Sequence, residues 1–543
     1  MLNIGRIALT EIRAARLTEP RPAKRSYVKE RDTSTQMADY GITHFVELGI
    51  AAYALYFVCS AIYLVFFHPL ARFPGPRLWA ASRIPWAFHV VKGDLWQVLQ
   101  RLHEQYGPVV RIAPDELTTT LPEAWKDLYA SKPLLLKDPH SQTPPLNGAH
   151  SLFTAEGDTH RRIRGVLSNS FSDKALRTQA PIIEKYAYQL IARVRREAGQ
   201  GEGGAGGVDL TKLYGYAAFD TITDLSLGES LARGLEDMNE HSWIQGYFFH
   251  AKFSAVRIAL SRFSPLDAFL GLFLLSVTRK ARQRNWRVIT GALDRRMARN
   301  DAQEKRSDLL TPLVDRLDES QRVGITKAEM MSNGLAFVIA GTQLNTNLLS
   351  TATYLLLRHP DKLERLVEEV RGRFSDDNEI TVQATHDLPY LDAVLNETLR
   401  IRHPTPINLP RIVSQGGCLV NGQRVPSNAI VGINLQNIQN SSTLWVEPRQ
   451  FHPERFLPAK DPRYDARFDG DVKEAFAPFS VGPRNCVGYK LFYAQVRVLL
   501  ARVVWNFNLV RERVDPTEGD WLDQKAWFAF EPRPVFVKIS KEN

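Results

Sequence analysis

The pattern of hydrophobic and polar positions changes sharply near the start of the chain. Residues 48–67, LGIAAYALYFVCSAIYLVFF, contain no charged residue, and about 20 apolar residues are what a helix needs to cross a bilayer. A buried core helix has the same composition. The N-terminal position and the tyrosines, which favour the membrane interface, instead predict a single membrane-spanning helix over residues 45–67.

The residues before this span are polar, and residues 1–44 are predicted to be a disordered leader. Three arginines within residues 72–83 follow the span and would hold the rest of the chain in the cytosol, whereas the basic leader would pull the other way. A start at Met37 removes this conflict. We therefore hypothesise that residues 1–36 are an extension of little catalytic consequence. A mitochondrial address competes, but the span directly behind the leader argues against it.

Beyond the span, the periodicity predicts one large domain. Prolines stiffen residues 68–80, HPLARFPGPRLWA, into an extended neck. Alternating apolar residues near VVRIAPDELTTTL predict a small sheet, and helical periodicity dominates from about residue 155 to 405. No linker interrupts residues 81–543, which are predicted to be mainly α with a small β region.

Composition narrows the class of protein. Hydrophobic residues make up 44% and charged residues 24% of the chain, as in ordinary globular proteins. The three cysteines, Cys59, Cys418 and Cys486, offer no disulfide framework, which fits a reducing compartment. The net charge of +10 is scattered without a basic stripe, so a membrane surface or an acidic protein partner fits better than nucleic acid.

Cys486 lies in FSVGPRNCVG, among residues unlike those of a packed core. Gly482 and Gly488 permit a sharp turn and close approach to something flat and large, and Arg484 brings positive charge to the sulfur. Such a thiolate is a metal ligand. A lone cysteine without a CxxC partner excludes a structural zinc site.

The pattern Phe-x-x-Gly-x-Arg-x-Cys-x-Gly, filled by Phe479, Gly482, Arg484, Cys486 and Gly488, resembles the haem-binding loop of the cytochrome P450 family. The resemblance implies a P450 fold and haem b, with the Cys486 thiolate as axial ligand. Further family marks follow in order along the chain. They are His160, Arg164 and Arg411, which would face the haem propionates, and Glu397, Arg400 and Arg455, which would form the buried network that locks the scaffold.

The resemblance also implies partners and a location. It implies a single-pass, monomeric protein of the endoplasmic reticulum membrane with a cytosolic catalytic domain, closest in character to filamentous-fungal enzymes of secondary metabolism. Electrons would come from NADPH through the flavins of NADPH-cytochrome P450 reductase, docking near Arg484, Lys490 and Arg497. A hydrophobic small molecule would be the substrate.

The chain departs from the family on the long central helix, where residues 340–347 read AGTQLNTN. Gln343 stands at the family's acid position and Leu344 at its alcohol position, so both proton-handling groups are missing. Thr342 and Thr346 lie about 200° around the helix from Leu344. Thr346 can hydrogen-bond a carbonyl four residues back, and Asn345, about 100° away, is expected at the pocket edge.

Three consequences stay open at this point. Substrate or water supplies the protons to an oxygenase; the substrate desaturates, couples, rearranges or expands a ring instead of gaining oxygen; or the substrate already carries a reactive group. The rival from another class is a non-catalytic haem binder or sensor. Gly341 is expected to allow close approach to the haem.

The substrate is expected to contact four regions by family position, namely Pro406–Leu409, Ala336, Phe337 and the loop Pro144–Phe153. Residues 263–287 join an apolar run to a basic one. They fit a lipid-headgroup contact and a core helix with a basic surface about equally well.

Overall fold

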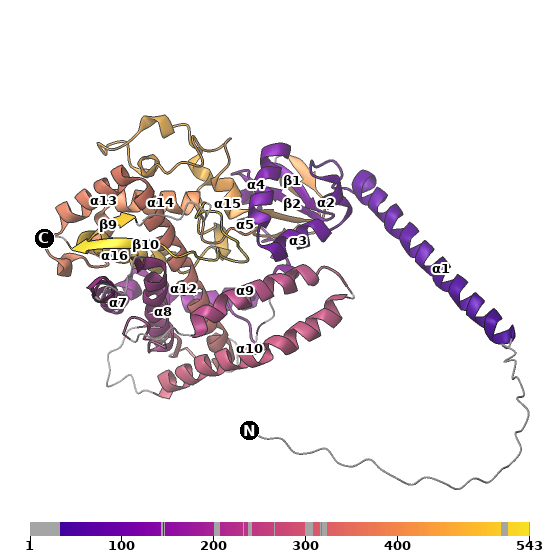
Figure 1. The fold of residues 1–543 in the computed structure, drawn as a ribbon, viewed down its shortest axis with the longest axis horizontal. Helices are drawn as coiled ribbons and strands as arrows, with labels where there is room; N and C mark the ends of the chain where they lie inside the picture. Colours follow the sequence, from indigo (N-terminus) through magenta and orange to yellow (C-terminus); the bar gives the residue numbers. More distant parts are fainter. Residues whose placement is uncertain are drawn as a thin grey trace, which may run out of the picture. The chain divides into compact units, whose positions relative to one another are not determined.

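The fold is known from a computed structural model. It describes residues 33–541 except 143–144, 146, 200–206, 232, 237–241, 265, 299–307, 315, 318–322, 421 and 512–519. The chain divides into two compact units, residues 1–60 and 61–543. Figure 1 shows a helix-rich larger unit with small sheets.

The first helix, α1 (Thr33–Ile62), continues into a π-helix, η1 (Tyr63–Phe67). Residues 44–67 are the one stretch in the described residues that is long and apolar enough to cross a membrane, with a mean hydropathy of 2.1, and none of it is buried. Residues 33–44, predicted to be disordered, are helical, because each residue added to an established helix gains a hydrogen bond. Residues 1–32 lie outside the described residues.

The larger unit contains long helices joined by short ones. The helices before the centre are α2 (Arg77–Ala81), α3 (Ile84–Lys92), α4 (Leu95–Tyr106), α5 (Ala124–Tyr129), α6 (Gly157–Ser168), α7 (Asp173–Gly199), α8 (Leu210–Leu227), α9 (Ser242–Leu260), α10 (Leu266–Ala298) and α11 (Thr311–Val314). Those that follow are α12 (Lys327–Arg358), α13 (Pro360–Arg373), α14 (Pro389–Ile401), α15 (Leu435–Gln439) and α16 (Tyr489–Asn506).

The main sheet joins two distant parts of the sequence, as the indigo and orange strands in Figure 1 show. Its order is β1-β2-β8-β5-β3, with β2 and β8 parallel and the other pairs antiparallel. The strands are β1 (Val109–Ala113), β2 (Glu116–Thr119), β3 (Leu136–Lys137), β5 (Arg411–Ile412) and β8 (Ile430–Ile433). Two smaller sheets comprise β4 (Val208–Asp209), β10 (Phe536–Lys541) and β9 (Phe507–Arg511), and β6 (Cys418–Val420) and β7 (Gln423–Val425).

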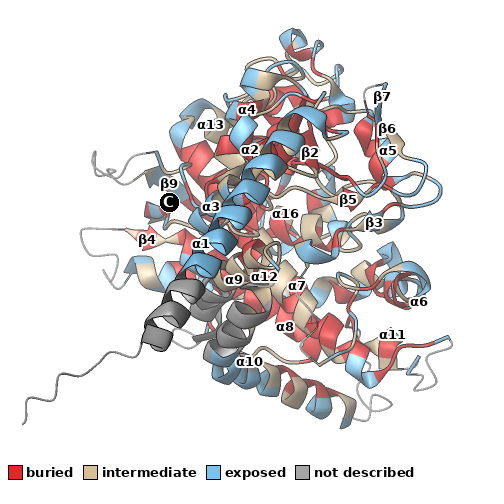
Figure 2. Ribbon diagram, turned by 90° about the vertical axis from the view of Figure 1, so that its right-hand side faces the viewer, coloured by how far each residue is buried: buried red, intermediate tan, exposed pale blue. Residues whose placement is uncertain are grey.

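Helix α12 is the buried centre of the larger unit (Figure 2). Thr326 begins it with a capping box, in which its hydroxyl accepts from the Glu329 N–H and the Glu329 carboxylate accepts from the Thr326 N–H. The neighbouring α8 is buried over almost its whole length. Both helices also bury polar side chains, and hydroxyls such as those of Thr221 and Thr342 donate to carbonyls four residues back, so these groups keep a hydrogen bond inside the molecule.

The proline-rich neck packs on β1 and is held by one arginine. The Arg111 N–H donates to the Pro74 carbonyl (2.7 Å). The buried Arg111 guanidinium donates to the carbonyls of Leu64 (2.8 Å) and Pro114 (2.6 Å). A Cβ at Gly75 would lie 2.3 Å from the Arg111 carbonyl oxygen. The π-helix and the neck are therefore fastened to the sheet of the larger unit.

Candidate active site around Cys486

The loop that carries Cys486 depends on one glycine for its shape. Gly482 has a φ of 74°, and a Cβ there would lie 2.2 Å from the Tyr129 carbonyl oxygen of α5. No other residue fits this position without moving backbone. The Cys486 N–H closes the loop on the Phe479 carbonyl (2.9 Å), and the Phe479 ring contacts Phe492 of α16, with ring centroids 5.3 Å apart.

Cys486 is accessible to solvent although protein atoms surround it. Its side chain is solvent-exposed, yet burial raises the pKa of its thiol above the ordinary value. Both hold for a sulfur that lies close to many protein atoms and is not covered by them. The Gly488 N–H and the nearby Arg164 act in the opposite direction and lower the pKa. These two groups are the ones that would stabilise a thiolate here.

Four predicted basic residues, three arginines and His160, lie in or beside this loop. His160 and Arg164 share one face of α6, and Arg164 donates to the Asn485 carbonyl (2.7 Å) and to its side-chain oxygen (2.5 Å). Arg484 donates to the Ala155 carbonyl (3.0 Å) and pairs with Glu156. Arg411 donates to the Pro410 carbonyl (3.0 Å) and lies over the Tyr129 ring.

The charges in this cluster do not balance. Burial, followed by the charges of Arg484, Lys137 and Arg164, lowers the pKa of His160 to about 4. The pKa of Arg411 is lowered by burial and by Arg484, with Tyr129 and Glu156 opposing. Lys137 belongs to this cluster, although the sequence motifs gave no sign of it. Such a surplus of cations fits a ligand that carries carboxylates, as a porphyrin does.

One face of α12 remains incompletely buried, and it is apolar. Ala336, Ala340 and Leu344 recur at four-residue spacing and are only partly buried, whereas positions 345–356 are fully buried. Gly341 was expected to allow close approach to a haem. A Cβ there would lie 2.5 Å from Ile222 Cγ1 of α8, so the packing of the two helices requires this glycine.

The protic side chains near Leu344 all bond elsewhere. The hydroxyls of Thr342 and Thr346 donate to carbonyls four residues back, at 2.7 and 2.8 Å, which confirms the helix-geometry prediction for Thr346. Gln343 donates to Asn347 Oδ1 (3.1 Å). Asn345, expected at the pocket edge, instead donates to the Gln495 side chain of α16, because α16 packs against that face of α12.

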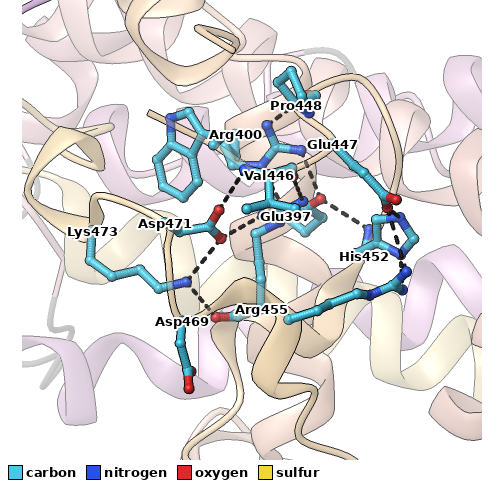
Figure 3. Close-up of polar contacts among 12 residues, drawn as sticks. Glu397, Arg400, Val446, Glu447, Pro448, His452, Arg455, Asp469, Asp471 and Lys473 are labelled. Carbon is cyan, nitrogen blue, oxygen red and sulfur yellow. Dashed lines mark hydrogen bonds and ion pairs between the residues drawn. The ribbon is translucent and has the colours of Figure 1, made fainter. Parts of the chain in front are cut away.

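The predicted network of Glu397, Arg400 and Arg455 is assembled and fully buried (Figure 3). Arg400 binds Glu397 through two hydrogen bonds of 2.7 and 2.8 Å, and Arg455 Nε lies 3.0 Å from Glu397 Oε2. The structure adds Asp471, whose carboxylate accepts from Arg455 Nη1 at 2.5 Å. Two buried arginines thus meet two carboxylates, and the partly exposed Lys473 adds a third cation 3.3 Å from Asp471 Oδ2. The sequence around Asp471, FDGDVKEAF, reads as a polar loop and gave no sign of this role.

Two further polar contacts tie the site together and were not predicted. Buried His403 accepts from the Thr405 N–H at Nδ1 (3.1 Å), so its Nε2–H donates to the Pro478 carbonyl (2.9 Å) beside Phe479. Arg162 joins α6 to α12 through two hydrogen bonds to Glu329, of 2.6 and 3.0 Å.

The structure also places the cations expected to dock the reductase and one residue expected to contact the substrate. Arg484 faces the cation cluster, and Arg497 pairs with Asp392 with only 15% of its side chain exposed. Of the three expected docking cations, Lys490 is the most exposed, at 33%, and it pairs with Asp173. Phe337 is buried, and its ring contacts Phe171; its contact with substrate stays a prediction.

Two other predictions concern residues that are described only in part. In the loop before Phe153, Pro144 lies outside the described residues. Most apolar side chains between residues 266 and 275 of α10 do so too, so the choice between lipid contact and core helix for residues 263–287 stays a prediction.

A model of the family described as Cytochrome P450 matches residues 73–538. This chain belongs to the cytochrome P450 family, whose members are haem-thiolate oxidoreductases, so it is an enzyme and the family implies haem.

Curated relatives match over most of their length. Averantin hydroxylase of Dothistroma septosporum is 37% identical over 504 residues, covering 93% of this chain and 92% of that protein. Versicolorin B desaturase of the same organism is 34% identical over 498 residues, covering 91% and 93%. Cytochrome P450 monooxygenase lcsI of Purpureocillium lilacinum is 36% identical over 493 residues, covering 89% and 92%. The names of these relatives indicate enzymes of fungal secondary metabolism.

Proposed function

We propose that Cys486 would ligate the iron of a haem and that His160, Arg164, Arg411 and Arg484 would hold its propionates. The observation that carries the proposal is a lone cysteine, accessible to solvent although protein surrounds it, beside a surplus of cations. When bound, the haem would oxidise a substrate by using dioxygen and electrons. His160 is neutral near pH 7, so it would donate one N–H as a hydrogen bond.

The substrate we propose is a hydrophobic secondary metabolite, with a polyketide as the first class to test. The enzyme inserts oxygen into it, as in a monooxygenase. The alternative is ring expansion, desaturation, coupling or rearrangement without net oxygen insertion. Relatives of similar identity carry the names of a hydroxylase and a desaturase, so similarity does not separate the two. The difference must come from the residues around the pocket.

Helix α12 bears on the choice between these two reactions because its side chains near Leu344 offer no proton to the reacting centre. Leu344 presents a side chain that cannot donate a proton, and Thr342, Gln343, Asn345 and Thr346 have their donors bonded to other groups. Protons must therefore reach the reacting centre from water or from the substrate. A substrate hydroxyl in the pocket would serve this purpose in the oxygen-inserting enzyme.

The remaining proposals concern partners. Electrons would come from NADPH-cytochrome P450 reductase, and the span 44–67 would anchor the enzyme as a monomer in the endoplasmic reticulum membrane, with its larger unit in the cytosol. The apolar, unburied span supports the anchor. A spanning helix leaves the larger unit close to lipid, where hydrophobic substrates concentrate.

Haem ligation is tested by Cys486→Ser, with Cys418→Ser as the matched control. Cys418 is partly buried, and burial raises the pKa of its thiol to about 11. We expect the reduced C418S protein to give the carbon monoxide spectrum of a thiolate-ligated haem, and the C486S protein to lack it. A normal spectrum from C486S would refute the ligand assignment.

The reaction is tested by mass spectrometry of metabolites from the producing organism with and without the gene. A lost product one oxygen heavier than the precursor that accumulates identifies monooxygenation. A product two hydrogens lighter, or isomeric with its precursor, identifies the alternative. An unchanged metabolite profile would contradict both.

A further inference from the structure

The edge of the main sheet places two cations directly opposite each other. Strand β3 pairs antiparallel with β5, so that Lys137 faces Arg411 and Leu136 faces Ile412. Opposite residues of such a pair lie on the same face, and like charges there destabilise the sheet. Leu136 is exposed while Lys137 is turned toward the interior and half-buried. An anion between the two side chains would relieve their repulsion.

The surroundings of Lys137 contain too little negative charge to balance it. Burial, Arg484 and Arg411 together lower the pKa of Lys137 to about 7, with Glu156 alone opposing them. Glu156 is itself paired with Arg484. Lys137 forms no ion pair with any residue of the described part of the chain.

The Lys137 ammonium nevertheless has a fixed position and donors to spare. Its Nζ donates to the Phe153 carbonyl at 2.7 Å. An ammonium has three N–H donors, and in the described residues Phe153 is its one acceptor. A carboxylate that enters the cluster between Lys137 and Arg411 would find a point charge and a planar fork on facing strands.

We propose that Lys137 is a further haem-propionate residue, which shares a propionate carboxylate with Arg411 and links the haem to the loop at Phe153. This inference rests on the proposed haem site. The sequence gave no motif for it, because the role follows from the pairing of β3 with β5 across more than 270 residues of chain.

The test is the rate at which the reconstituted, full-length protein releases haem to an excess of a haem-scavenging protein. Lys137→Met removes the charge and keeps the length, Lys137→Arg keeps the charge, and Lys126→Met is the control. Lys126 is an exposed lysine of nearby α5. We expect K137M to release haem roughly 10- to 100-fold faster than the wild type, the range for a lost hydrogen bond to a charged group. K137R and K126M should stay close to the wild type.

Haem dimethyl ester separates a propionate contact from a general loss of structure. Its esterified propionates carry no charge, so the wild type and K137M should release it at the same rate. A K137M rate equal to the wild-type rate with ordinary haem would overturn the inference. So would a rate difference that persists with the ester. If the wild type takes up no haem and shows no thiolate spectrum, the proposed function fails first.

Discussion

Leu344 occupies the position on α12 where a hydroxyl would be expected in this family, and it is only partly buried. An isobutyl group neither donates a proton nor orders water. The protic side chains next to it already bond to carbonyls or to other amides. A hydroxyl placed at position 344 would therefore add a proton donor that the helix otherwise lacks at this point. The position therefore permits a clean experiment on proton delivery.

We predict that Leu344→Thr changes how much of the NADPH consumed ends in product and how much in hydrogen peroxide. A positioned donor contributes roughly 10²–10⁴-fold to a proton-transfer rate, so the effect should exceed that of Leu344→Val, which has the same shape without the hydroxyl. Peroxide and product are measured together in the reductase-supported reaction. Identical values for L344T and L344V would show that protons do not pass this position.

Sequence reasoning reached some of these residues and missed others for a definite reason. The orientation of Thr346 depends on helix geometry alone, and it was predicted correctly. The partner of Asn345 depends on where α16 packs, and the role of Lys137 depends on which strand pairs with β3. Local periodicity contains neither fact. Motifs recover residues that a family shares, whereas packing decides the rest.

At the scale of elements, α14 contacts the loops that precede the haem loop through a buried network of charged side chains. Glu397, Arg400, Arg455 and Asp471 are fully excluded from solvent and carry no net charge together. Removing one partner of a buried ion pair leaves an uncompensated charge. Replacing Asp471 should therefore lower the free energy of unfolding at least as much as replacing Glu397.

Asp471→Asn should lower the free energy of unfolding by about 3–5 kcal/mol. Asp469→Asn, two residues away at an exposed position (Figure 3), is the control and should have little effect. Denaturant unfolding followed by circular dichroism measures both. If D471N were as stable as D469N, Asp471 would not be needed to balance the charge of Arg455.

The contact between α6 and α12 should make stability depend on pH. Burial raises the pKa of Glu329, but the hydrogen bonds from Arg162 and Thr326 outweigh it, so the pKa lies below its ordinary value of 4.5. A group whose folded-state pKa is lowered stabilises the fold above its unfolded pKa. This contribution is lost as pH falls through the folded value.

We expect Arg162→Met to cost about 3 kcal/mol near neutral pH and to flatten the loss of stability below about pH 4.5. Arg161→Met is the matched control, because Arg161 is the adjacent residue with 81% of its side chain exposed. Thermal unfolding of the three proteins at a series of pH values gives the slopes. An R162M slope equal to that of the wild type would exclude Glu329 as the titrating group.

For the whole molecule, the division into residues 1–60 and 61–543 falls within the proposed anchor, so that residues 44–60 of the span belong to the smaller unit and residues 61–67 to the larger one. Truncation to Met37 keeps the span and should leave both membrane association and activity unchanged. Truncation to Ala61 removes most of the span and should release the protein into the soluble fraction after centrifugation of lysed cells. A protein starting at Met37 that is inactive or mislocalised would refute the view that residues 1–36 are dispensable.

The same boundary predicts where truncation begins to damage the fold. A protein that starts at Ala61 keeps the Leu64 carbonyl, which accepts from the Arg111 guanidinium at 2.8 Å. A protein that starts at His68 lacks it, and Arg111, only 1% exposed, would lose an acceptor beside β1. An unsatisfied buried donor costs about 1–3 kcal/mol, so the shorter protein should unfold at lower denaturant concentration.

Replacing Arg111 with methionine should abolish the difference between the two truncations, because no guanidinium would then depend on Leu64. If the difference survived in R111M, other contacts of residues 61–67 would be responsible for it.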